Sequence, residues 1–159
     1  MRSEIKPVPD EYDELWMLLY QVVTGLGKAA ENEARPLGVS ALQGGVLFAL
    51  KATDGPATTT QISQWLFRER HSVSELLSRM EKQGLVKRVR SRSKSGMVDV
   101  ALTRKGERIF SRYNEERKII RKILSCLSLE ERASLRIHLE KLRESALEQL
   151  PVRPRLPFP

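Results

Sequence analysis

One stretch, residues 57–106, constrains the fold more than any other part of the chain. It holds two short helical patterns, followed by two strand-like segments joined by a basic loop. In the second helical pattern, apolar residues recur at i, i+3, i+4 and i+7, which is typical of one buried helix face. We expect Ser72 and Glu75 to form a capping box that starts this helix, and Gly84 to end it. The apolar residues are Val73, Leu76, Leu77 and Met80.

The first helical pattern is also capped, because Thr58 precedes Gln61 by three residues. Ile62, Trp65 and Leu66 form its predicted buried face. Two short helices with a tight connector form a helix-turn-helix, whose second helix can enter a major groove. The outer face of that second helix carries short polar groups and a guanidinium, which suits a close approach to a partner.

A β-hairpin is predicted after the two helices. Residues 85–90 and 97–102 have the β-branched content of strands, and the basic residues 91–96 join them. A helix-turn-helix followed by a hairpin with a basic tip is a winged helix. The stretch resembles the winged helix of the MarR family, the multiple-antibiotic-resistance regulators. The matching residues are Ser72–Ser74, Leu76–Glu81, Gly84–Val86, Arg88, Ala101–Thr103 and Gly106.

The wing departs from the family pattern at one point. The family usually has an Asp-x-Arg element there, and its spacing from Gly84 and Thr103 places it at Lys94 to Gly96, where neither residue is present. We therefore expect a wing with few packing contacts, in which Arg92 takes over the minor-groove contact.

Positive charge is concentrated on the same stretch. The net charge of the chain is +8. Residues 68–108 hold 12 Lys plus Arg and 5 Asp plus Glu, a balance of +7, and the remainder holds 16 and 15, a balance of +1. A polyanion is the natural partner of such a patch. A solvated basic surface or a site for an acidic protein is the blander alternative.

We assign the expected DNA contacts by position. The outer face of the second helix would meet base edges and nearby phosphates, the start of the helix-turn-helix would hold phosphates, and the wing would follow the backbone or a minor groove. The predicted DNA-binding residues are Thr58, Thr59, Arg68, Arg70, Ser72, Ser74, Ser78, Arg79, Arg88, Arg90, Arg92 and Lys94.

Long apolar stripes at helical spacing flank the winged helix on both sides. One runs from Tyr12 to Leu26; a second follows Thr103, which we expect to cap one long helix, and a third follows a capping box at Ser128 and Glu131. Each stripe is either an ordinary core face or a dimerisation face. Family resemblance implies the latter, with the first and last helices of two subunits interlocked.

These patterns together predict a mainly α fold with a small β-hairpin wing: a winged helix-turn-helix flanked by N- and C-terminal dimerisation helices. The single domain spans residues 1–159. Its expected parts are a winged helix at 41–106, dimerisation helices at 10–34 and 107–150, and flexible ends at 1–9 and 151–159.

Composition argues against several other classes. The chain has two histidines, His71 and His138, and one cysteine, Cys126, so we expect no metal site, no cofactor and no enzyme activity. No apolar run is long enough to span a bilayer, no signal peptide is evident, and a cytoplasmic location is expected. Cys126 lies beside Leu124 and Leu127, which favours a buried structural cysteine over an oxidant sensor.

The predicted function is sequence-specific binding of double-stranded DNA by a homodimer, most simply as a repressor on a pseudo-palindromic operator. The alternatives are a winged helix used for protein–protein contact and a ligand-modifying enzyme on a helical scaffold. The resemblance also implies a small aromatic effector in a cleft between the dimerisation helices and the winged helix. Candidate lining residues, which are equally explained as core, are Trp16, Tyr20, Phe48, Phe110 and Tyr113.

Overall fold

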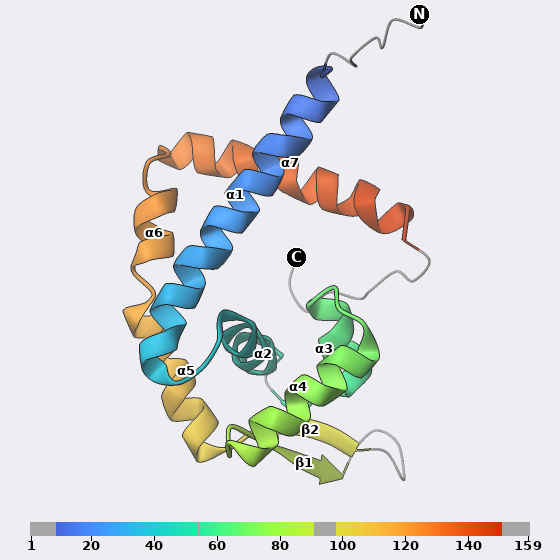
Figure 1. The fold of residues 1–159 in the computed structure, drawn as a ribbon, viewed down its shortest axis with the longest axis vertical. Coiled ribbons are helices and arrows are strands. Elements are labelled where there is room, and N and C mark those ends of the chain that lie inside the picture. Colours follow the sequence, from blue (N-terminus) through green and yellow to red (C-terminus); the bar gives the residue numbers. More distant parts are fainter. Residues whose placement is uncertain (1–8, 54, 91–97, 151–159) are drawn as a thin grey trace, which may run out of the picture.

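A computed structural model of the protein describes residues 9–53, 55–90 and 98–150 (Figure 1). The fold is mainly helical, with one two-stranded antiparallel sheet, as the sequence predicted. The elements in chain order are α1 (Glu11–Ala34), a 3-10 turn η1 (Arg35–Leu37), α2 (Ala41–Ala52), α3 (Thr59–Trp65), α4 (Arg70–Lys82), β1 (Val86–Arg90), β2 (Val98–Leu102), α5 (Arg104–Glu116), α6 (Ile119–Leu124) and α7 (Leu129–Glu148).

The core lies inside the winged helix. The apolar face predicted for α4 is confirmed, because Val73, Leu76, Leu77 and Met80 are all buried. These side chains pack with buried residues of α2, α3, β1 and β2, among them Leu47 and Ile62, into one hydrophobic cluster. This packing leaves the opposite face of α4 outside.

The wing is tied to the start of the helix-turn-helix by a third, one-residue strand. β1 and β2 pair from Val86 opposite Leu102 to Arg90 opposite Val98. On the other edge of β2, Ala57 pairs with Val100 through two backbone hydrogen bonds of 2.9 and 2.8 Å. Several predicted segments lie outside the described residues: the loop 91–96, the strand residue Met97, the flexible tail 151–159 and most of the flexible end 1–9.

Most of the helix ends follow the sequence signals. The predicted capping boxes at Thr58 and Ser128 are confirmed, and Thr103 caps α5 as expected. Ser40, three residues before Gln43, forms a further capping box at the start of α2, which the same spacing predicts. Gly84 follows α4 at φ +71°, a left-handed conformation that favours glycine.

The capping box predicted at Ser72 is wrong. α4 begins three residues earlier than a cap at Ser72 implies, at Arg70, and its N-cap Glu69 makes no side-chain capping bond. The connector, which the sequence predicts at residues 67–71, is shorter in the structure. Phe67 adopts a left-handed φ of 51°, and the Arg68 N–H donates to the Ser63 carbonyl. The chain therefore reverses within a few residues, and Arg70 belongs to the helix instead of the connector.

The single long helix expected after Thr103 is also wrong. The structure divides it into α5 and α6, with the break at Arg117, whose ψ is 67°. A carboxylate from α1 stabilises the break: Glu33 Oε1 accepts a 2.6 Å hydrogen bond from the Ile119 backbone N–H, at the start of α6. No glycine or proline marks this break in the sequence.

The terminal helices expose their apolar side chains. α7 has no buried residue, and Trp16 in the first half of α1 is 66% exposed. In Figure 1 the first turns of α1 project past α7, at the end of the molecule opposite β1 and β2. Cys126 is exposed, so the expectation of a buried cysteine is wrong; it follows α6 in an open connection. Within the described ranges, no helix is both long enough and apolar enough to cross a membrane.

Candidate nucleic-acid interface

The outer face of α4 presents polar side chains beside the wing. Ser72 and Arg79 are exposed, and Ser74 and Ser78 are half-buried. The Ser78 hydroxyl donates to the Ser74 carbonyl at 3.0 Å, so this hydroxyl is available to a partner mainly as an acceptor. Arg79 is the one long, charged group among the four, and an arginine can donate two parallel hydrogen bonds to a guanine.

Of the predicted phosphate contacts, some already hydrogen-bond within the chain and others are exposed to solvent. Thr58 is engaged in the cap of α3, because its hydroxyl accepts from Gln61 N–H at 3.1 Å and also contacts Gln61 Oε1 at 3.0 Å. Thr59 is half-buried at the first position of that helix. Arg68 and Arg70 are exposed on either side of the N-cap of α4, where positive charge and helix N–H groups favour an anion.

The wing begins with a strand rich in cations. Arg88 and Arg90 are exposed on β1, and alternate residues of a strand share a face. Arg88 Nε lies 3.2 Å from Glu81 Oε2, an ion pair that ties β1 to the last turns of α4. The predicted contacts Arg92 and Lys94 lie outside the described residues.

Sequence reasoning missed two groups that fix the interface. Glu81 orients Arg88, and Lys105 Nζ donates to the Gln83 carbonyl at 2.8 Å, at the end of α4. The two contacts join residues that are seven and 22 positions apart and that belong to different elements. Only the fold shows that these residues meet.

A second cluster lies where α1, α2 and α5 meet. The Phe48 and Phe110 rings are 6.4 Å apart between centroids, and the Arg117 guanidinium carbon lies 5.9 Å from the ring centroids of both Phe48 and Tyr113. Burial raises the pKa of the Tyr113 hydroxyl above its ordinary value, an effect that the Arg117 charge partly offsets. Tyr113 packs so closely on α2 that a Cβ at Gly44 would lie 2.7 Å from its ring.

The structure thus brings together three of the five predicted effector residues, Phe48, Phe110 and Tyr113. Arg117, which the sequence analysis did not single out, joins them. Trp16 and Tyr20, both on α1, are exposed. Tyr20 is eleven residues before Glu31, whose charge acts on Tyr113, which corresponds to roughly 16 Å along a helix. In one chain, therefore, these two aromatic residues do not line the same site.

No group of three or more His, Cys, Asp or Glu side chains able to hold a metal ion occurs among the described residues. The arrangement instead offers a polar helix face, flanked by exposed arginines, next to a basic strand. This combination defines a winged helix-turn-helix protein.

Comparisons with known proteins agree with this class. A sequence model described as the MarR family matches residues 37–94. The uncharacterized HTH-type transcriptional regulator YfiV of Bacillus subtilis (strain 168) is 30% identical over 126 residues, which cover 79% of this chain and 78% of that protein. The chain belongs to the MarR family of transcription regulators.

Solved structures share the fold. The organohalide-sensing regulator RdhR, in its 2,4-dichlorophenol-bound form, is 26% identical with a TM-score of 0.80, and the match covers 100% of this chain and 99% of that one. A MarR variant from E. coli in complex with operator DNA is 22% identical with a TM-score of 0.74, over 84% of this chain and 99% of that one. The second likeness concerns the fold alone.

Proposed function

We propose that the protein is a homodimeric, sequence-specific DNA-binding repressor that covers a pseudo-palindromic operator. The observation that carries the proposal is the two-sided character of α4. Its apolar face is buried in the winged-helix core, and its outer face holds Ser72, Ser74, Ser78 and Arg79 beside the exposed arginines of β1. An α-helix fits the major groove, where serine and arginine can contact base edges.

The exposed apolar side chains of α1 and α7 support the dimer. A single chain leaves Leu15, Trp16, Leu139 and Leu142 between 45% and 66% exposed. Large contiguous apolar surfaces mark interaction sites. A two-fold dimer would also place two copies of α4 on one side, as two half-sites require. We include a cytoplasmic location in the proposal, because the similar regulator YfiV is from Bacillus subtilis, a bacterium whose DNA lies in the cytoplasm.

The test is binding of the purified protein to the DNA upstream of its own gene, compared with random DNA of equal length. We expect tighter binding to the first, and a log affinity that falls steeply with log salt, since several phosphates are neutralised. A slope under about two released ions per dimer would contradict phosphate tracking by the wing and α3. Equal affinity for both DNAs at every salt concentration would favour the alternative, a winged helix that contacts proteins and does not discriminate DNA sequences.

We further propose a small aromatic acid or phenol as effector at the cluster of Phe48, Phe110, Tyr113 and Arg117. The rings supply apolar and edge contacts, and the guanidinium can pair with an acidic group. RdhR, which shares the fold over the full chain, was solved with 2,4-dichlorophenol bound. Titrating 2,4-dichlorophenol and benzoate into the protein–DNA complex should release DNA, and Phe48→Ala should abolish that release without weakening DNA binding in the absence of effector.

A further inference from the structure

The break between α5 and α6 has the geometry of a tight turn. Arg117 has φ −70° and ψ 67°, and the Lys118 N–H donates to the Glu116 carbonyl at 2.7 Å. These values define an inverse γ-turn, in which the hydrogen bond closes over a single residue. The turn interrupts the ladder of helical hydrogen bonds, so α6 is not a continuation of α5.

The local sequence does not require this turn. Residues 107–150 contain no glycine or proline, and the arginine and lysine of the turn are good helix formers. In one continuous helix the Ile119 N–H would donate to the Glu115 carbonyl, as in any α-helix. The same segment therefore has a second accessible conformation, a single helix over residues 104–124. A contact from elsewhere in the fold selects between the two.

That contact comes from the last turn of α1. Glu33 Oε1 accepts the Ile119 N–H at 2.6 Å, and Lys118, the N-cap of α6, makes no side-chain capping bond within the described chain. Glu33 Oε2 is buried and has no hydrogen-bond partner among the described residues. A buried carboxylate oxygen without a donor costs free energy, which subtracts from the gain of the charged hydrogen bond. The preference for the turn therefore depends on Glu33 and is smaller than a fully paired carboxylate would provide.

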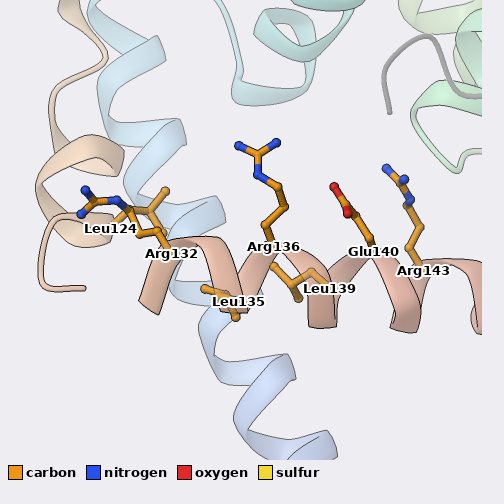
Figure 2. Close-up of a pocket in the computed structure, with 7 residues that line it drawn as sticks. All are labelled: Leu124, Arg132, Leu135, Arg136, Leu139, Glu140 and Arg143. Atoms are coloured by element: carbon orange, nitrogen blue, oxygen red, sulfur yellow. The ribbon is translucent and has the colours of Figure 1, made fainter. Parts of the chain in front are cut away.

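α6 and α7 follow the turn as one unit. Figure 2 shows Arg132 of α7 beside Leu124 of α6, and the Arg132 guanidinium donates to the Leu127 carbonyl in the connection between the two helices. The two helices also line one hollow of about 370 Å³. On the other side of the turn, Glu31 Oε2 accepts the Ala41 N–H at 2.7 Å, at the start of α2 in the winged helix. The last turn of α1 thus fastens the winged helix to the terminal helices.

We infer that Glu33 is a positioning residue for operator binding, which acts by holding the turn at Arg117. The inference rests on the proposed homodimer, because α6 and α7 expose the apolar side chains that a partner would cover. A dimer contacts two half-sites at a fixed separation, so the two copies of α4 must be held at the matching distance. Straightening the turn in each subunit would rotate the winged helix away from that position without altering α4 itself.

The test compares two alanine variants in the same turn of α1. Glu33→Ala removes the contact with α6, and Glu31→Ala removes the same charge from a side chain that bonds the start of α2, where the capping box at Ser40 remains. Nuclear magnetic resonance measures the backbone carbonyl carbon shift of Arg117. In Glu33→Ala this shift should move into the range of helical residues. In the wild type and in Glu31→Ala it should stay outside that range.

DNA binding is measured on the full operator and on a duplex that holds one half-site. Apparent affinity falls in proportion to the population of the competent state, so Glu33→Ala should weaken binding to the full operator at least about tenfold. Binding to the single half-site should change by less than about twofold, because one winged helix needs no partner at a fixed distance. Glu31→Ala should stay within about threefold of the wild type on both duplexes.

A proline at the first position of α6 gives an independent check. Ile119→Pro removes the N–H that Glu33 accepts, but proline suits the first residue of a helix and breaks a helix in its interior. Added to Glu33→Ala, this substitution should return the Arg117 shift to its wild-type range. It should also restore operator affinity to within about threefold of the wild type.

Several results would overturn the inference. An unchanged Arg117 shift in Glu33→Ala would mean that Glu33 does not hold the turn. A changed shift with unchanged operator affinity, or equal losses on the operator and the half-site, would mean that the turn does not position α4. The same conclusion would follow if Glu31→Ala lost as much affinity as Glu33→Ala, or if the proline restored the turn but not the affinity.

Two further outcomes are separated by the same measurements. If Glu33→Ala does not fold, as judged by circular dichroism, Glu33→Gln decides, because its uncharged amide oxygen forms a weaker hydrogen bond and should move the Arg117 shift in the same direction. No movement in Glu33→Gln would refute the inference. A wild-type protein that binds the operator no better than random DNA would instead refute the proposed function, and the Arg117 shift would still show whether Glu33 holds the turn.

Discussion

α4 and α7 both carry apolar residues at helical spacing, but only those of α4 are buried within the chain. The apolar residues of α4 are buried against α2, α3 and the sheet, whereas α7 has no buried residue and leaves Leu139 and Leu142 about half exposed. Periodicity therefore predicts that a helix has an apolar face, but it does not predict whether the same chain covers that face. The difference separates a winged helix that can bury its own core from terminal helices that require another surface.

The largest expected effect is on the winged-helix core. Leu77→Ala should lower the free energy of unfolding by about 2–5 kcal/mol, because Leu77 is almost completely buried in the cluster with Leu47 and Ile62. Urea unfolding followed by circular dichroism measures this. The loss at Leu77 should be the same at every protein concentration. A concentration-dependent loss would mean that the core itself forms only on assembly.

Leu139→Glu tests the other side of the comparison. We expect this substitution to split the dimer while α2 to α5 stay folded, because Leu139 is 45% exposed in the single chain and contributes nothing to the winged-helix core. Sedimentation measures the dimer and near-ultraviolet dichroism measures the fold. An intact dimer would contradict the placement of α7 at the interface.

Arg79→Ala should have a more moderate effect. If Arg79 contacts a base, the change should cost about 1–3 kcal/mol of affinity for the operator and much less for random DNA. Arg121→Ala, which removes the same charge from exposed α6, is the control. Equal losses on both DNAs would make Arg79 a phosphate contact.

The smallest effect is expected at the wing. Arg92→Ala should weaken operator binding slightly, and more so when A·T-rich flanks narrow the minor groove. Competition between operators with A·T-rich and G·C-rich flanks measures the difference. Equal losses on both flanks would assign Arg92 to the phosphate backbone, and no loss would mean that the wing does not contact DNA.

The sequence predicted the parts of the fold that depend on local chemistry. The caps at Ser40, Thr58, Thr103 and Ser128 are formed by residues three apart, so they are visible in a short window. The start of α4 and the break after α5 were predicted wrongly, because the first depends on a left-handed Phe67 and the second on Glu33 reaching across from α1.

The candidate site shows the same division. The polar outer face of α4 follows from its apolar periodicity, and the exposure of Arg68, Arg70 and Arg79 agrees with their predicted roles. Two contacts could be identified only from the structure. Arg88 pairs with Glu81, and the Thr58 hydroxyl is bonded to Gln61 in the cap of α3. Of the five predicted effector residues, Phe48, Phe110 and Tyr113 form one cluster. Trp16 and Tyr20 are exposed in the single chain.

The one-residue strand at Ala57 has a consequence for how the chain folds. Its bridge to Val100 joins residues 43 positions apart (100 minus 57) and encloses α3, α4 and β1 in one closed loop. Closing a loop of that length costs entropy that only the completed packing inside it offsets. The bridge should therefore form late and break only when the whole unit opens. The amide protons of Ala57 and Val100 should exchange with solvent as slowly as those at the centre of α4, even though Ala57 lies in a connection between helices.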